Sequence, residues 1–173
     1  MRFVPILAAG LLILAAACGG GSDSGSGGST SDPQAFTKNY ILTNANVFSG
    51  EKSARDLLNL YTPKCREGTS EKDLSSAIQM AQAFVPKIKG VKFEDADFGD
   101  KFKSTKTANG FEVTVPPTND SRLKINGKWG NAHEQLVALG IEDAGDGDDT
   151  QKLTLELVDG KLLSADCDAI SLR

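Results

Sequence analysis

The sequence predicts an α+β domain over residues 33–173, with N-terminal helices packed on a curved antiparallel sheet. Three observations support this fold class. Apolar residues recur at helical spacing up to about residue 85, they alternate with polar residues from residue 91 onward, and Gly, Pro or Asn separates the segments. A segment of about 140 residues suits one core, so we expect a single domain.

The first two helices have recognisable ends. Asp32 is expected to cap a helix that has Pro33 at its first position and ends at Ser49–Gly50. A second helix is expected over Glu51–Tyr61, because Pro63 then prevents its continuation.

A third helix is expected between Ser70 and Pro86. Ser70 followed by Asp73 resembles a capping box. The apolar residues of this helix form one stripe, which we assign to the core: Leu74, Ile78, Ala81 and Val85.

The second half is expected to form strands. Val91 and Phe93 alternate with polar residues, and so do the residues of 111–115 before Pro116–Pro117. The segment 107–110 is expected to turn that strand back onto 101–106, and Asn126–Gly127 is a second turn candidate.

The last hairpin is expected to join residues 151–157 to residues 161–167. A two-residue Asp-Gly loop would pair Leu155 with Ser164 and mix apolar and polar side chains on one face. A three-residue loop would instead pair Leu155 with Leu163 and place Cys167 on the apolar face. We therefore expect the three-residue loop.

Residues 1–17 have the pattern of an export signal. Arg2 is followed by an apolar run that is shorter than the roughly 20 residues of a membrane-spanning helix, and small residues precede Cys18. The pattern resembles the lipobox of bacterial lipoproteins, which implies cleavage before Cys18 and attachment of fatty acyl chains such as palmitate. The alternative is an ordinary secretory leader with a free Cys18.

Residues 18–32 are expected to form the lipidated cysteine and a flexible tether. The fourteen residues of 19–32 include no large apolar side chain. Such a Gly/Ser chain has a typical reach of about 20 Å and a maximum of about 50 Å. The domain is thus expected on the outer side of the cytoplasmic membrane, held there through Cys18.

The charge pattern argues against nucleic acid as a partner. Without Arg2 the chain has 18 basic and 23 acidic residues, a net charge of −5. Lysines are dense between Lys87 and Lys106, but Glu94, Asp95, Asp97 and Asp100 alternate with them. A nucleic-acid site needs an unbalanced basic surface instead.

Cys65 and Cys167 are expected to form a disulfide. They are the two cysteines left once Cys18 is lipidated, and an exported protein meets an oxidising compartment. Two buried free thiols are the alternative.

Two segments resemble exported members of the nuclear-transport-factor-2-like family. Residues 60–66 (LYTPKCR), followed by Ser70–Leu74, are similar to a step in which one helix ends and the next begins with Ser and acids. Residues 158–168 are similar to the closing hairpin of that family. The resemblance implies a cone-shaped sheet around helices, with an apolar cavity at its open end.

Few residues offer catalytic chemistry. The chain has one histidine, His133, which excludes two-histidine zinc sites and is expected to be a surface or capping residue rather than a base. Asp95 and Asp97 are two apart on a strand and could present a carboxylate to the cavity or simply an exposed acidic face. Trp129 is a further cavity candidate, although packing or a rim position is the simpler interpretation.

The acidic run between residues 142 and 149 does not fit a calcium loop. Gly145 and Gly147 stand where an EF-hand needs ligands, so we expect a solvated loop with at most weak calcium binding. The chain also has no GxSxG, P-loop or GxGxxG motif. No metal or cofactor is therefore expected.

These features together predict a non-catalytic, lipid-anchored binding or accessory domain for a small apolar ligand or an envelope protein. One alternative is a cofactor-free isomerase or dehydratase, which would need a buried acid beside a tyrosine hydroxyl. The other is a structural or partner-binding envelope protein, which would expose a large apolar patch.

Overall fold

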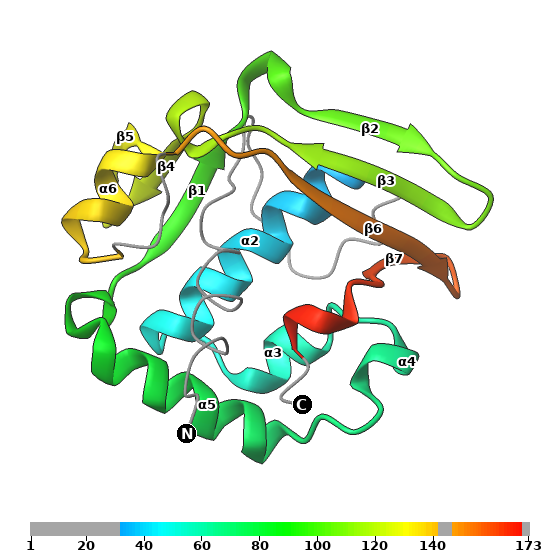
Figure 1. Cartoon of the computed structure of the whole chain (residues 1–173), viewed down its shortest axis with the longest axis horizontal. Helices are drawn as coiled ribbons and strands as arrows, with labels where there is room; N and C mark the ends of the chain where they lie inside the picture. Colours follow the sequence, from blue (N-terminus) through cyan, green and yellow to red (C-terminus); the bar gives the residue numbers. More distant parts are fainter. Residues whose placement is uncertain (1–31, 142–146, 171–173) are drawn as a thin grey trace, which may run out of the picture.

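A computed structural model provides the structure of the chain and describes residues 32–141 and 147–170. The architecture is α+β, as the sequence predicts, and its strands form two antiparallel sheets rather than one. Figure 1 shows helix α2 crossing the centre of the molecule. The two sheets lie above it, one toward each side of the view, and helices α3 to α5 lie below it.

The second half of the chain contains an α-helix, α6, between β5 and β6, although strands alone were expected there. The bounds of the α-helices are α2 (Pro33–Ser49), α3 (Ala54–Leu58), α4 (Pro63–Arg66), α5 (Glu71–Phe84) and α6 (Ala132–Ala138). The chain also has short 3₁₀ helices: η2 (Pro86–Ile88), η3 (Gly99–Lys101), η4 (Thr118–Asp120) and η5 (Cys167–Ala169).

The first helix has the predicted ends. The Asp32 carboxylate accepts a hydrogen bond from the Gln34 N–H (2.9 Å), and Pro33 occupies the first turn. Gly50 ends the helix at a φ of +86°, a conformation that glycine adopts without steric cost.

The predicted second helix is shorter than expected and is followed by another. Ser53 and Asp56 form a capping box, which starts α3 three residues later than the sequence suggests. Pro63 ends that region but also opens α4, because proline is tolerated in the first turn of a helix. Helix α5 begins at the predicted Ser70 cap, and its apolar stripe is buried as expected.

The strands pair in two sheets. The three-stranded sheet has the order β1-β4-β5 and the four-stranded sheet the order β2-β3-β6-β7. The strands are β1 (Phe93–Asp97), β2 (Lys103–Lys106), β3 (Gly110–Val115), β4 (Arg122–Ile125), β5 (Lys128–Asn131), β6 (Gln151–Val158) and β7 (Lys161–Ser164).

The predicted turns between the earlier strands are confirmed. Residues 107–109 connect β2 to β3, and Asn126–Gly127 connects β4 to β5. Asn126 and Gly127 both have positive φ values (48° and 81°), as a two-residue turn between antiparallel strands requires.

The predicted register of the last hairpin is wrong. Its loop has two residues, Asp159 and Gly160, and Leu155 pairs with Ser164. Ser164 is fully buried on the apolar face. Its burial is tolerated because its backbone and its hydroxyl hydrogen-bond to polar groups inside the protein. Strand β7 ends there, and Cys167 belongs to η5 instead of the strand.

Helix α2 covers the outer edge of the three-stranded sheet. The Asn46 side chain donates to the Phe93 carbonyl (2.8 Å) and accepts from the Phe93 N–H (3.1 Å). The amide of Asn46 therefore replaces a neighbouring strand at this point of β1.

A disulfide joins the two halves of the domain. Cys65 of α4 and Cys167 of η5 are bonded, with 4.6 Å between their Cα atoms and a sequence separation of 102. Nearby, the Ser164 N–H donates to the Leu60 carbonyl and the Thr62 N–H donates to the Ser164 carbonyl. The expected pairing of the cysteines is thus present.

One hydrophobic core lies between the helices and the inner faces of the strands. It unites side chains that are distant in sequence, among them Tyr40, Ile41, Leu57, Ile78, Phe93, Val113, Leu123 and Leu155.

Candidate functional site

The exposed face of the three-stranded sheet brings the charged and aromatic candidates together. The register places Asp97 opposite Arg122, and Lys124 opposite Trp129. The buried neighbours of β4, Leu123 and Ile125, point to the core, so Arg122 and Lys124 point outward. We refer to Asp97, Arg122, Lys124 and Trp129 as the sheet face.

Asp95 and Asp97 have separate partners. A bulge lies between Phe93 and Asp95, and the Asp95 carboxylate pairs with Lys38 of α2. Asp97 accepts a hydrogen bond from the Gly99 N–H (3.1 Å). About a third of each carboxylate side chain is exposed, 33% for Asp95 and 36% for Asp97, so both meet solvent.

The bulge also brings Glu94 to the sheet face. Its carboxylate lies 3.1 Å from the Lys124 ammonium. Acidic and basic groups therefore alternate across β1 and β4, and neither sign dominates. Exposed ion pairs of this kind contribute little to stability, typically about 0–1 kcal/mol each.

Trp129 and Arg122 form the least satisfied part of the sheet face. The Arg122 guanidinium carbon lies 5.4 Å from the centre of the indole ring, a cation–π contact. The nearest carboxylate oxygen, on Asp97, is 4.0 Å away, which is beyond hydrogen-bond distance. Trp129 remains 41% exposed, a large area for an apolar side chain.

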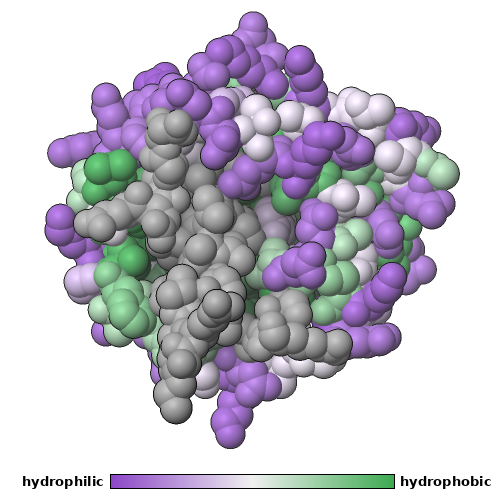
Figure 2. Space-filling model, viewed as in Figure 1, coloured by the Kyte–Doolittle hydropathy of each residue, from purple (hydrophilic) through white to green (hydrophobic). Residues whose placement is uncertain are grey.

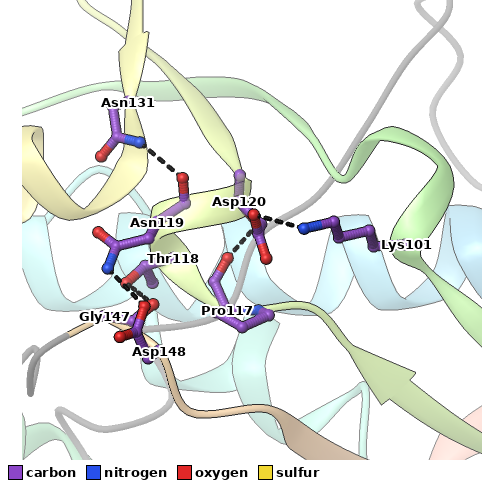
Figure 3. Close-up of polar contacts among 9 residues, drawn as sticks. Lys101, Pro117, Thr118, Asn119, Asp120, Asn131, Gly147 and Asp148 are labelled. Atoms are coloured by element: carbon purple, nitrogen blue, oxygen red, sulfur yellow. Dashed lines mark hydrogen bonds and ion pairs between the residues drawn. The ribbon is translucent and has the colours of Figure 1, made fainter.

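A polar cluster around η4 adjoins the sheet face. In Figure 3 the side chains of Asn119 and Asp148 point toward one another and hydrogen-bond at 2.8 Å. Asn131, at the end of β5, donates to the Asn119 carbonyl (2.9 Å), and Lys101 pairs with Asp120 (2.7 Å).

This cluster holds one end of the acidic run. The Gly147 carbonyl accepts from the Asn119 N–H (3.0 Å), and Asp148 and Asp149 are exposed. Residues 142–146 lie outside the described residues, so the expectation of a solvated loop stays a prediction for them. Over 32–141 and 147–170, no three His, Cys, Asp or Glu side chains are placed to hold a metal ion.

His133 lies on α6, close to the N-terminus of that helix. Asn131, not His133, caps the helix by accepting from the Glu134 N–H (3.1 Å). The Nδ1 atom of His133 is buried and has no hydrogen-bond partner. His133 is therefore half-buried rather than a simple surface or capping residue.

A buried pair of tyrosines forms a second polar centre. The hydroxyls of Tyr40 and Tyr61 are 2.5 Å apart, and both residues are fully buried. Burial raises the pKa of both hydroxyls above the usual tyrosine value, and their proximity adds to the rise for Tyr61. Asn44 and Ser164 also hydrogen-bond to Tyr40, and these bonds oppose part of the rise in its pKa.

Asp166 lies near this pair without joining its hydrogen bonds. Burial raises the pKa of the carboxyl, and the hydrogen bond from the Thr154 N–H (2.7 Å) opposes that rise. An isomerase would require an acid beside a tyrosine hydroxyl. The acid that comes nearest to this arrangement is Asp166, not Asp95 or Asp97. The tyrosine hydroxyls themselves are closed to solvent.

Apolar side chains are exposed where the end of α5 lies next to α6. Met80 and Phe84 lie one turn apart on α5 and are 63% and 69% exposed, and Val137 of α6 is 48% exposed. Lys87 in η2 reaches the Ala138 carbonyl (3.5 Å), so the end of α5 lies next to α6. Hydrophobic atoms line this margin in Figure 2.

Sequence reasoning singled out Asp97 and Trp129 but missed Arg122 and the tyrosine pair. The signal for Arg122 was available, because a two-residue turn at Asn126–Gly127 pairs Lys124 with Trp129, which places Arg122, two residues before Lys124, on the same side of the sheet. No local pattern links Tyr40 to Tyr61, which are 21 residues apart.

The leader, Cys18 and residues 19–31 of the tether lie outside the described residues. Within the part of the chain that the structure describes, no helix has the length and apolarity to cross a bilayer. Comparison with known proteins finds no match among protein-family models, curated proteins or solved structures.

Proposed function

We propose that the chain is a lipid-anchored extracytoplasmic protein whose domain binds a ligand without catalysis. The observation that carries the proposal is the leader ending at Cys18, followed by a Gly/Ser tether and a domain with a disulfide. Disulfides persist in exported proteins and are rare in the cytosol. A diacylglyceryl group on Cys18 would supply the two acyl chains that stable anchoring needs.

The polar centres support a non-catalytic role. The tyrosine hydroxyls are buried and bonded to each other, and Asp95 and Asp97 are paired and partly exposed. An acid or base in catalysis must reach its substrate. A cofactor-free isomerase would therefore have to open the core to bring a tyrosine hydroxyl into contact with a substrate beside Asp166.

The resemblance to the nuclear-transport-factor-2-like family belongs to this proposal. It adds that the two sheets together form a cone around the helices, with an apolar cavity for a small ligand. The cavity is proposed on that resemblance alone.

Labelling at Cys18 tests the anchor. Cells expressing the full chain are fed an alkyne-tagged palmitate, and the protein is recovered from membrane and soluble fractions. We expect label and membrane association for the wild type and for the control Ser24→Ala, and neither for Cys18→Ser. Equal labelling of Cys18→Ser, or a soluble wild type with its leader uncut, would refute the proposal.

One observation favours a partner-binding envelope protein as the second candidate. Met80 and Phe84 are more than 60% exposed on one face of α5, and exposed apolar patches commonly mark interaction sites. Photo-crosslinking from position 84 in intact cells would test it. A discrete crosslinked protein is expected under this alternative, and no product beyond that of a control probe at Lys103 would remove it.

A further inference from the structure

We propose that the sheet face binds an uncharged saccharide, with Trp129 as the stacking platform and Arg122 as the main hydrogen-bond donor. This inference rests on the proposed binding function and names the class of ligand. It concerns the exposed face of β4 and β5, not the cavity that the family resemblance implies.

The platform is a rigid aromatic ring held at a sheet surface. Trp129 lies on β5 opposite Lys124, and 41% of it remains accessible. The faces of aromatic rings carry negative potential, which attracts the weakly positive C–H groups on one face of a sugar ring. A side chain with two rotatable bonds also loses little entropy when it binds.

Arg122 offers donors that the protein leaves unused. Among residues 32–141 and 147–170, its guanidinium makes a cation–π contact with Trp129 and a 4.0 Å ion pair with Asp97, and no hydrogen bond. A guanidinium has five N–H donors in a fixed plane. The guanidinium lies over the indole ring, so the two side chains hold this donor array together at the sheet face.

Acceptors stand beside these donors. One oxygen of Asp97 accepts from Gly99, and the other is in reach of a ligand hydroxyl that lies next to Arg122. Sugar hydroxyls both donate and accept, so one hydroxyl can bridge a carboxylate and a guanidinium. A simple anion lacks the donor that Asp97 would require.

The charge balance favours a neutral ligand. Lys124 and Arg122 are matched by Glu94 and Asp97 on the same face. An anionic ligand would meet these two carboxylates, and a cationic ligand would meet the two basic groups. An uncharged polyol avoids both penalties and uses both kinds of group.

Fluorescence of the full chain tests the inference, because Trp129 is the sole tryptophan and its emission reports on this face alone. The protein is purified from whichever cell fraction contains it and titrated with chitotetraose, cellotetraose, mannotetraose and tetragalacturonate. We expect a saturable change in emission with at least one neutral tetrasaccharide, at about millimolar Kd, or about −4 kcal/mol.

Variants locate the site by calorimetry with the same saccharide. Trp129→Ala is expected to weaken binding at least tenfold, and Arg122→Lys severalfold because lysine keeps the charge but loses the planar donors. Phe84→Ala, which removes an exposed aromatic ring elsewhere, is the matched control and should bind like the wild type.

Three results would overturn the inference: no saturable change with any neutral sugar, binding of tetragalacturonate alone, or binding that Trp129→Ala leaves intact. The anchor test on Cys18 is independent of them. A protein that binds saccharide but lacks the lipid refutes the location only, and a lipidated protein without saccharide binding refutes the ligand only.

Discussion

The buried tyrosine pair predicts strongly non-additive mutations. Tyr40→Phe and Tyr61→Phe each delete one hydroxyl from a pair 2.5 Å apart that has no access to water. In each single variant the remaining tyrosine hydroxyl stays buried without its partner, and this lowers the free energy of unfolding by about 1–3 kcal/mol. We expect about 2 kcal/mol for each.

The double variant should lose less than the sum of the two. Once both hydroxyls are gone, no tyrosine oxygen is left unpaired, although Asn44 and Ser164 still lose a partner. We expect a total loss of about 2.5 kcal/mol, which leaves a coupling energy of about 1.5 kcal/mol between the two positions.

Urea unfolding followed by circular dichroism measures all four corners of this cycle. Tyr61→Phe combined with Ser104→Ala, an exposed position on β2, is the control and should be additive within about 0.5 kcal/mol. If the two tyrosine variants are equally additive, the hydroxyls are not coupled and the network has been misread.

Three further outcomes follow from the structure. Replacing Cys65 and Cys167 together by Ser should lower the unfolding free energy by about 4–5 kcal/mol in the chain-entropy model, since the bridge spans 102 residues; a loss below about 1 kcal/mol in urea titrations would contradict this. Gly110→Ala places a Cβ atom 1.9 Å from the Leu155 carbonyl oxygen and should destabilise by about 3 kcal/mol, with faster amide exchange in β3 and β6; unchanged exchange would argue against the close approach. Burial raises the folded-state pKa of Asp166 above 3.8, so the folded state holds its proton more tightly and the wild type should lose stability as the pH rises from about 4 through that pKa. Asp166→Asn should remove this decline in urea titrations at successive pH values, and an identical pH profile would refute the assignment.

Local patterns predicted the starts of α2 and α5 and most turns, because caps and turns depend on neighbouring residues. Asp32 and Ser70 cap as expected, and Asn126–Gly127 forms the expected two-residue turn. These features involve contacts within four residues, where spacing and side-chain chemistry decide the structure.

The last hairpin shows where such reasoning ends. The alternation of apolar residues favoured a register with Leu155 opposite Leu163. In the structure Leu155 is opposite Ser164, which is buried because residues 60–62 supply hydrogen-bond partners for its backbone. Here the partners that make a buried Ser164 acceptable are about 100 residues away in sequence, and a local pattern does not reveal them.

Helix α6 was missed for a different reason. It has only seven residues, and two of them, Ala132 and Leu136, reach the core. Asn131 followed by Glu134 offers a cap signal, but the segment is too short for apolar periodicity to stand out. Without α6, one sheet was expected where the structure has two.

The amide of Asn46 has a consequence for self-association. Exposed strand edges are templates on which other chains can add strands. The Asn46 amide hydrogen-bonds to the backbone of Phe93 at the edge of β1, and residues 60–62 do the same at Ser164 on the edge of β7. The other two edge strands, β2 and β5, carry lysines. Each edge strand is therefore either hydrogen-bonded by another segment of the protein or positively charged. This disfavours fibril growth even where many copies of the protein are close together.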